Sequence, residues 1–139
     1  MEVAENLKKI ILENFDIFQE KNIAIGSVDP SRFDNGGNYC VIIPENKTIT
    51  QTNIDESFES EIKFTISMMF RGAKHIDLVK RMEKTADDFN KLLLTDFDLG
   101  GNAKDITPGA TKYFYDCGTV EKQATGLDIE LTITIAEEI

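Results

Sequence analysis

Two stretches of strict alternation between apolar and polar residues constrain the fold of this chain more than any other feature. Residues 62–70 and 127–135 each place an apolar side chain at every second position. Strand side chains point alternately to opposite faces of a sheet, so each stretch predicts a strand with one buried face and one wet face. Antiparallel sheets have this character, whereas parallel sheets covered on both faces do not.

Two segments with helical spacing can supply the cover for that sheet. Leu7, Ile11, Phe15 and Phe18 recur at helical spacing within residues 3–19. A second apolar stripe follows within residues 76–93, formed by Ile76, Val79, Met82, Ala86, Phe89, Leu92 and Leu93. Each stripe predicts an amphipathic helix. We therefore expect an α+β fold, with both helices packed on one face of a mostly antiparallel sheet.

Shorter strand-like runs complete the expected element order, αββββαββ. They cover residues 23–25, 39–43 and 111–123, and the final strand follows Gly126. Pro44 lacks an N–H, which predicts a strand end or a sheet edge at that position. Residues 44–60 are polar and rich in Thr and Asn, which predicts either a long hairpin arm or a mobile loop. Turn formers in residues 29–38 and the pair Pro108 and Gly109 predict breaks between elements.

Length and charge limit the classes of function. The 139 residues are enough for a single domain that covers the whole chain. With 15 basic and 25 acidic residues the net charge is −10, so we expect no direct affinity for nucleic acid. No run approaches the roughly 18 apolar residues of a membrane span, and the N-terminal segment lacks the pattern of a signal peptide. We expect a protein made and kept in the cytoplasm, with no membrane partner.

No set of residues predicts catalysis. His75 is the only histidine, it is expected in a surface loop before the second helix, and no partner for general-base chemistry stands near it in the sequence. No serine lies in a GxSxG motif, and the glycine pairs at 36–37 and 100–101 lack the phosphate-binding patterns, which leaves them as turns. We expect that the protein is not an enzyme and needs no cofactor.

Metal binding is not expected either. Asp96 and Asp98 loosely resemble the start of a calcium loop, in which the sixth position, Gly101, fits. The twelfth position is Thr107, where such a loop needs a bidentate glutamate. Two cysteines, Cys40 and Cys117, and one histidine are too few for a structural zinc site. We expect two free thiols of the buried type, with a disulfide as the alternative.

Residues 58–93 join an alternating strand that ends in Arg71, a short loop and an amphipathic helix. Together with the leading helix, the polar arm after Pro44 and the terminal strand in LDIELTITIAEE, this segment resembles the small minor capsid or tail terminator (tail completion) proteins of long-tailed bacteriophages. The resemblance covers most of the chain and rests on the order and character of its elements. It implies a structural virion protein, made in the cytoplasm of a bacterial host.

The resemblance also implies partners. Proteins of this family form a ring, usually of six subunits, that sits on the last ring of the tail tube, stops its growth and offers a surface to the DNA-filled head. The implied partners are other copies of the chain, a tail tube protein and a head-completion protein, and DNA passes through the ring. A channel lined by acidic residues would not retain that DNA.

Four residues are candidates for contacts between subunits. Ile49 and Ile54 are isolated apolar residues in the polar arm, and such residues gain most when a partner covers them. Asp87 and Asp88, on the polar side of the second helix, would face the channel or a neighbouring subunit, with simple solvation as the alternative.

Other classes of function fit the same pattern. One is a small cytoplasmic adaptor that binds a protein partner on its exposed sheet face. Another is a head-closure or tail tube protein, and a tube subunit differs from a terminator because it polymerises without a stop. A small-ligand enzyme would need a deep pocket with converging polar groups around His75.

Overall fold

The computed structural model describes residues 2–26, 37–72, 74–95, 103–119 and 123–138. In chain order the elements are α1 (Glu2–Asn14), the short 3-10 helix η1 (Glu20–Asn22), β1 (Ile23–Ile25), β2 (Tyr39–Thr52), β3 (Ser57–Arg71), α2 (His75–Leu94), β4 (Ala103–Phe114) and β5 (Ala124–Glu138). The strands form one sheet in the order β1-β2-β3-β5-β4. Only β1 and β2 pair in parallel, so the sheet is mostly antiparallel as expected.

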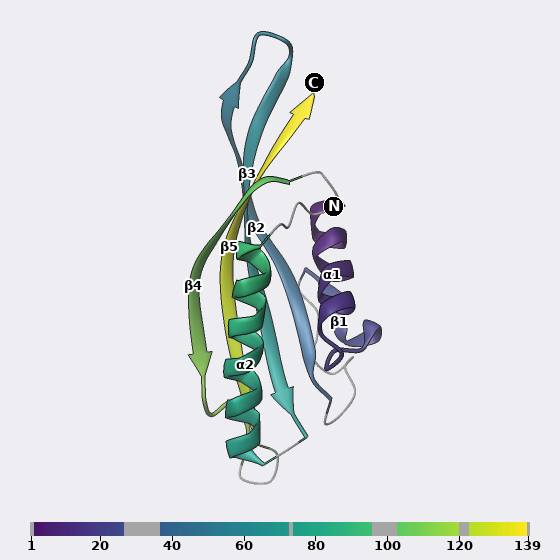
Figure 1. Ribbon diagram of the computed structural model, residues 1–139, viewed down its shortest axis with the longest axis vertical. Helices are drawn as coiled ribbons and strands as arrows, with labels where there is room; N and C mark the ends of the chain where they lie inside the picture. The colour runs from purple at the N-terminus through teal and green to yellow at the C-terminus, as the bar shows by residue number, and fades with distance from the viewer. Residues whose placement is uncertain (1, 27–36, 73, 96–102, 120–122, 139) are drawn as a thin grey trace.

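Both helices cover one face of this sheet, which confirms the predicted fold class (Figure 1). The two alternating stretches became the paired central strands β3 and β5, where Phe64 lies opposite Leu131 and Ile66 opposite Ile129. The core-facing side chains of both strands are almost fully buried. Phe15, just after α1, and Phe89 of α2 meet with ring centroids 6.1 Å apart, so the segment that follows α1 packs on α2.

The first helix is shorter than predicted. It ends at Asn14 instead of continuing to residue 19, and the Asn14 side chain donates a hydrogen bond to the Ile10 carbonyl oxygen at 2.9 Å. This side-chain bond spans the last turn of α1, and the Phe15 backbone N–H donates to the Ile11 carbonyl oxygen at 2.9 Å. Phe15 and Phe18 are nevertheless buried, because the chain after the helix still packs on the core.

The second helix also differs in detail from the prediction. It begins at His75, and Ile76, which was expected in the buried stripe, is 59% exposed. Leu78 is buried in its place. The buried stripe therefore begins two residues later than predicted, because the first turn of α2 lies at the margin of the core.

Two predicted breaks lie inside strands. Pro44 is part of β2, which continues for eight residues beyond it, and only the prediction of a sheet edge is confirmed there. Pro108 and Gly109 lie within the edge strand β4, at an irregularity in its pairing with β5. A Cβ on Gly109 would lie 3.0 Å from the Glu130 carbonyl oxygen, so glycine allows this close approach. Residues 115–119, expected as strand, follow the end of β4.

Gly72 ends β3 as predicted, and its φ of 86° explains why. This backbone conformation is open to glycine and costly for residues with a Cβ. The turn directs the chain from the sheet to the start of α2. None of the helices in the described part of the chain is long and apolar enough to cross a membrane.

Candidate interaction surface

The segment from Pro44 to Ser60 is a hairpin arm and not a loop. It consists of the end of β2, a tight turn and the start of β3, and it projects beyond the ends of both helices (Figure 1). Every residue from Glu45 to Glu56 is exposed. The sequence left two alternatives open for this segment, a long hairpin arm and a mobile loop, and the structure shows the hairpin. Its two sides are extensions of β2 and β3, so the described residues contain one strand fewer than the predicted order αββββαββ.

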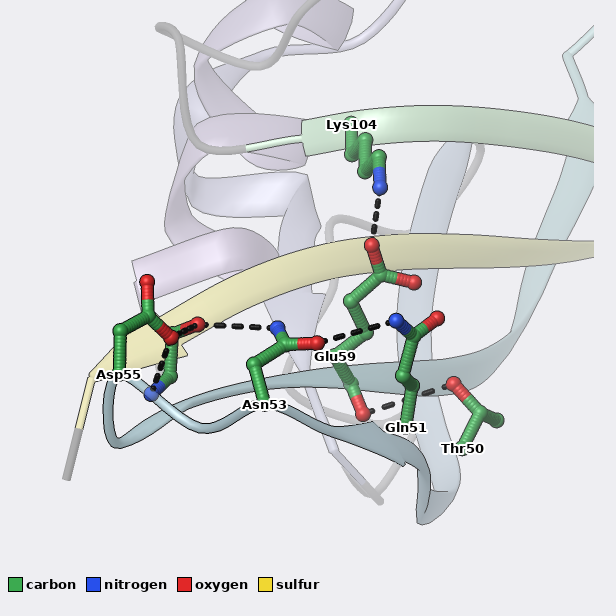
Figure 2. A network of polar contacts seen from close by, with 7 residues as sticks. Thr50, Gln51, Asn53, Asp55, Glu59 and Lys104 are labelled. Carbon is green, nitrogen blue, oxygen red and sulfur yellow. Dashed lines mark hydrogen bonds and ion pairs between the residues drawn. The ribbon is translucent and has the colours of Figure 1, made fainter.

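A network of short polar contacts forms the tip of the arm (Figure 2). The Asp55 carboxylate accepts hydrogen bonds from the backbone N–H and the hydroxyl of Ser57, at 3.2 and 2.6 Å, and these bonds lower the pKa of Asp55. Asn53 donates to the Ser57 hydroxyl oxygen at 2.9 Å and accepts from Gln51 at 3.0 Å. Local bonds of this kind stabilise the turn without any contact to the core.

Glu56 adopts a φ of 67° in the turn, a conformation that favours glycine or asparagine. We expect Glu56→Gly to stabilise the arm, because it removes backbone strain of about 1 kcal/mol. Hydrogen exchange should show slower exchange of the Asn53 amide, which bonds to the Ser57 carbonyl oxygen at 2.9 Å. Glu61→Gly, in the extended part of β3, is the matched control and should have the opposite effect. Faster exchange in Glu56→Gly would contradict the prediction.

Charged side chains tie the base of the arm to the sheet. Lys47 contacts the Glu137 carboxylate of β5 at 2.8 Å, and the Ser60 hydroxyl donates to the same carboxylate at 3.2 Å. Glu59 of the arm forms an ion pair with Lys104 at the start of β4 (Figure 2). The arm is therefore an extension of the sheet, since β5 also pairs with β3 as far as Ser57, and only the turn at residues 53–56 lies beyond the paired strands.

The arm carries the two apolar candidates from the sequence. Ile49 is 60% exposed and Ile54, at the tip, is fully exposed. Ile49 lies opposite Ser60, which shares the sheet face of the core residue Ile62. Neither isoleucine belongs to the hydrophobic core. The alternative that they pack on their own domain is therefore wrong.

The two open edges of the sheet carry features that oppose strand pairing with another molecule. β1 pairs with only Cys40–Ile42 of β2, so the edge of β2 beyond them has no partner strand among the described residues. That edge contains Pro44 and two irregularities of register, between Pro44 and Asn46 and between Ile49 and Gln51. β4 carries Pro108 and two similar irregularities. Prolines and bulges protect edges from pairing, so contacts of the arm should run through side chains.

Asp87 and Asp88 do not join the arm. Both lie in the middle of α2, and Asp88 forms an ion pair with Lys84 at 2.7 Å, whose hydrogen bond and charge raise the pKa of Lys84. Asp87 is exposed and lies close enough to Tyr113 of β4 for its charge to raise the pKa of that phenol, after the larger effect of burial. The candidate residues for subunit contacts thus lie on two separate surfaces, Ile49 and Ile54 on the arm and Asp87 and Asp88 on α2.

The candidate residues for catalysis and metal binding do not come together in the part of the chain that the structure describes. His75 is exposed at the first position of α2, where its backbone N–H donates to Gln123 Oε1 at 2.8 Å. No group of three metal-binding side chains exists among the described residues, and Asp96, Asp98 and the glycine pair at 100–101 lie outside them. Gly37, the described member of the first pair, accepts a hydrogen bond from Arg71 Nε at 2.8 Å.

The two cysteines are free, but only Cys40 is buried as predicted. Cys117 is exposed after the end of β4, because the strand stops at Phe114. Its thiol lies 3.5 Å from the Phe114 carbonyl oxygen, and partial burial with the charges of Asp116 and Asp128 raises its pKa.

We expect a thiol reagent to label Cys117 in the folded protein and Cys40 only after unfolding. Burial raises the pKa of Cys40 well above its ordinary value, so that thiol stays neutral and inaccessible in the fold. Labelling of Cys117 should accelerate as pH rises above about 8.5, the ordinary thiol value. Mass spectrometry after timed labelling checks both statements, with Cys117→Ser as control. Rapid labelling of Cys40 without denaturant would contradict them.

Sequence reasoning missed a cluster of exposed aromatic residues at the end of β4, formed by Tyr113, Phe114 and Tyr115. These residues were predicted only as part of a strand over residues 111–123. Three consecutive aromatic residues cannot all point to one face of a sheet, so the sequence itself indicated that at least one of them would be exposed.

Comparison of the chain with models of known protein families and with curated protein sequences finds no match.

Proposed function

We propose that this protein is a structural virion component of a long-tailed bacteriophage or prophage, a tail terminator whose copies form a ring. The observation that supports this best is the hairpin arm, which stands beyond the helix-covered core and exposes Ile49 and Ile54. We infer the family from the resemblance in element order, and the exposed arm is the proposed surface for assembly. The partners are further copies of the chain, a tail tube protein and a head-completion protein.

The arm suits a contact between copies on energetic grounds. The arm continues the sheet, because β3 pairs with both β2 and β5 as far as Phe58, and its exposed isoleucines lie outside the hydrophobic core. When a partner covers them, each removes apolar surface from water, which stabilises association by about 25 cal/mol per Å². A head-to-tail ring needs two different complementary surfaces on each subunit, and the arm provides one of them.

Electron microscopy of the purified protein, alone and mixed with tail tubes, tests the proposal. We expect rings of uniform size in the protein alone and the same rings at tube ends in the mixture. Light scattering after size exclusion gives the number of subunits, and tubes without the protein are the control. A protein that stays monomeric at high concentration and leaves tube ends bare would overturn the proposal. Tubes that grow longer in its presence would indicate a tube subunit instead.

A second candidate is a cytoplasmic adaptor that binds a protein on the helix-free face of the sheet. Tyr39, Met69 and Phe114 support it, because their positions in the register place them on that face and their side chains are at least partly exposed. The adaptor requires neither rings nor tubes. Binding of a soluble partner that Met69→Asp abolishes, in a protein that forms no rings, would favour this candidate.

A further inference from the structure

The end of β4 carries a pair of stacked tyrosines next to α2. The rings of Tyr113 and Tyr115 have centroids 6.0 Å apart and an interplanar angle of 28°. They are 36% and 48% exposed. Tyr113 lies opposite Leu127 of β5, a core residue, so it leaves the sheet on the face that the helices cover.

One stripe of α2 faces this part of β4. Glu83, Asp87 and Asn90 are spaced by four and three residues and therefore share a side of the helix. Asn90 donates a hydrogen bond to the Thr111 hydroxyl oxygen at 3.5 Å, which fixes that side against β4. Thr111 and Tyr113 are two residues apart, so their side chains lie on the same face of the sheet. The two carboxylates thus belong beside the tyrosine pair.

These carboxylates have no cation of their own within the described residues. Lys84, the lysine between them in the sequence, binds Asp88 at 2.7 Å instead. Neither Glu83 nor Asp87 takes part in an ion pair or hydrogen bond in that part of the chain. Burial raises the pKa of Tyr113, and the charges of Asp87, Tyr115 and Glu83 raise it further.

We propose that Tyr113, Tyr115, Glu83 and Asp87 bind an arginine or lysine side chain of a basic segment in a partner protein. The faces of aromatic rings carry negative potential and attract cations, and arginine stacks well on them. The two carboxylates complement the same charge, whereas an acidic segment would be repelled. The net charge of −10 favours the approach of a basic partner from a distance. This proposal does not depend on ring formation.

A titration with a short peptide containing two arginines, followed by NMR, tests the proposal. We expect the signals of Tyr113 and Tyr115 to shift with the peptide and not with a peptide that has glutamate in place of arginine. Asp87→Asn and Tyr113→Leu should each weaken binding by about two- to fivefold, the range of an exposed cation–π contact or ion pair. Tyr113→Phe keeps the aromatic face and should restore the affinity.

Glu61→Gln is the matched control for net charge. Glu61 is exposed on β3 and its replacement removes the same charge from another part of the surface. It should leave the affinity close to that of the unchanged protein. Equal weakening by Glu61→Gln and Asp87→Asn would mean that overall charge alone attracts the peptide and would overturn the proposal. Equal affinities of Tyr113→Leu and Tyr113→Phe would remove the role of the aromatic face.

Discussion

Replacing Ile49 and Ile54 together with aspartate is expected to abolish assembly and leave the fold intact. Both side chains are exposed on the arm and absent from the core, so the fold loses no buried contact. In an assembled ring the same changes would bury two charges without partners, each of which costs several kcal/mol. Size exclusion with light scattering should give the mass of one chain for the double variant.

The matched control adds the same two charges to the arm and keeps its isoleucines. Thr48 and Thr52 are exposed residues of β2, and the double variant Thr48→Asp, Thr52→Asp should retain rings. Circular dichroism and the urea midpoint report on the fold in both variants. Rings of unchanged size in a well-folded Ile49→Asp, Ile54→Asp variant would exclude the arm from the interface.

The largest loss of stability is expected from Phe89→Ala. Phe89 is 1% exposed and packs on Phe15, so its ring joins α2 to the segment that follows α1. Truncation of a buried phenylalanine removes transfer free energy and leaves a cavity, which together cost about 3–5 kcal/mol. A loss of this size exceeds a third of the unfolding free energy of many single domains.

Urea denaturation followed by circular dichroism measures this loss. Leu94→Ala is the control, because Leu94 is the last residue of the same helix and is 74% exposed. Its effect should stay within about 0.5 kcal/mol, as is common for surface positions. Equal unfolding free energies for Phe89→Ala and Leu94→Ala would show that the contact between Phe89 and Phe15 is not part of the stabilising core.

The best predicted parts of the fold are those in which one residue pattern dictates one geometry. The alternation in β3 and β5 has a period of two, and a shift of register by one residue would expose every apolar side chain. The break at Pro108 was predicted wrongly, and of the two alternatives at Pro44 the strand end was wrong and the sheet edge right, because a proline breaks the ladder only where its missing N–H would be needed. Both lie on edges of the sheet, where no neighbouring strand of the described part of the chain requires that N–H.

The candidate surfaces were less predictable, because they depend on which segments come together. Ile49 and Ile54 stood out by composition, and their exposure confirms that they are free of the core. Asp87 was identified, but its neighbour Tyr113 lies 26 positions later in the sequence and reaches it only through the packing of α2 on β4. Cys117 was assigned to the core because the sequence did not show where β4 ends.

Local spacing alone determined that this chain has a sheet covered on one face by two helices, since burial of an apolar face follows directly from the period of the pattern. Tertiary structure decided how far β2 and β3 extend as a pair and which side chains remain uncovered. Hydrogen bonds between strands at Asn53 and Ser57, and ion pairs from Lys47 and Lys104, join positions that no periodicity links. Such contacts depend on the assembled sheet, so only the structure decided between the hairpin and the loop that the sequence left open for residues 44–60.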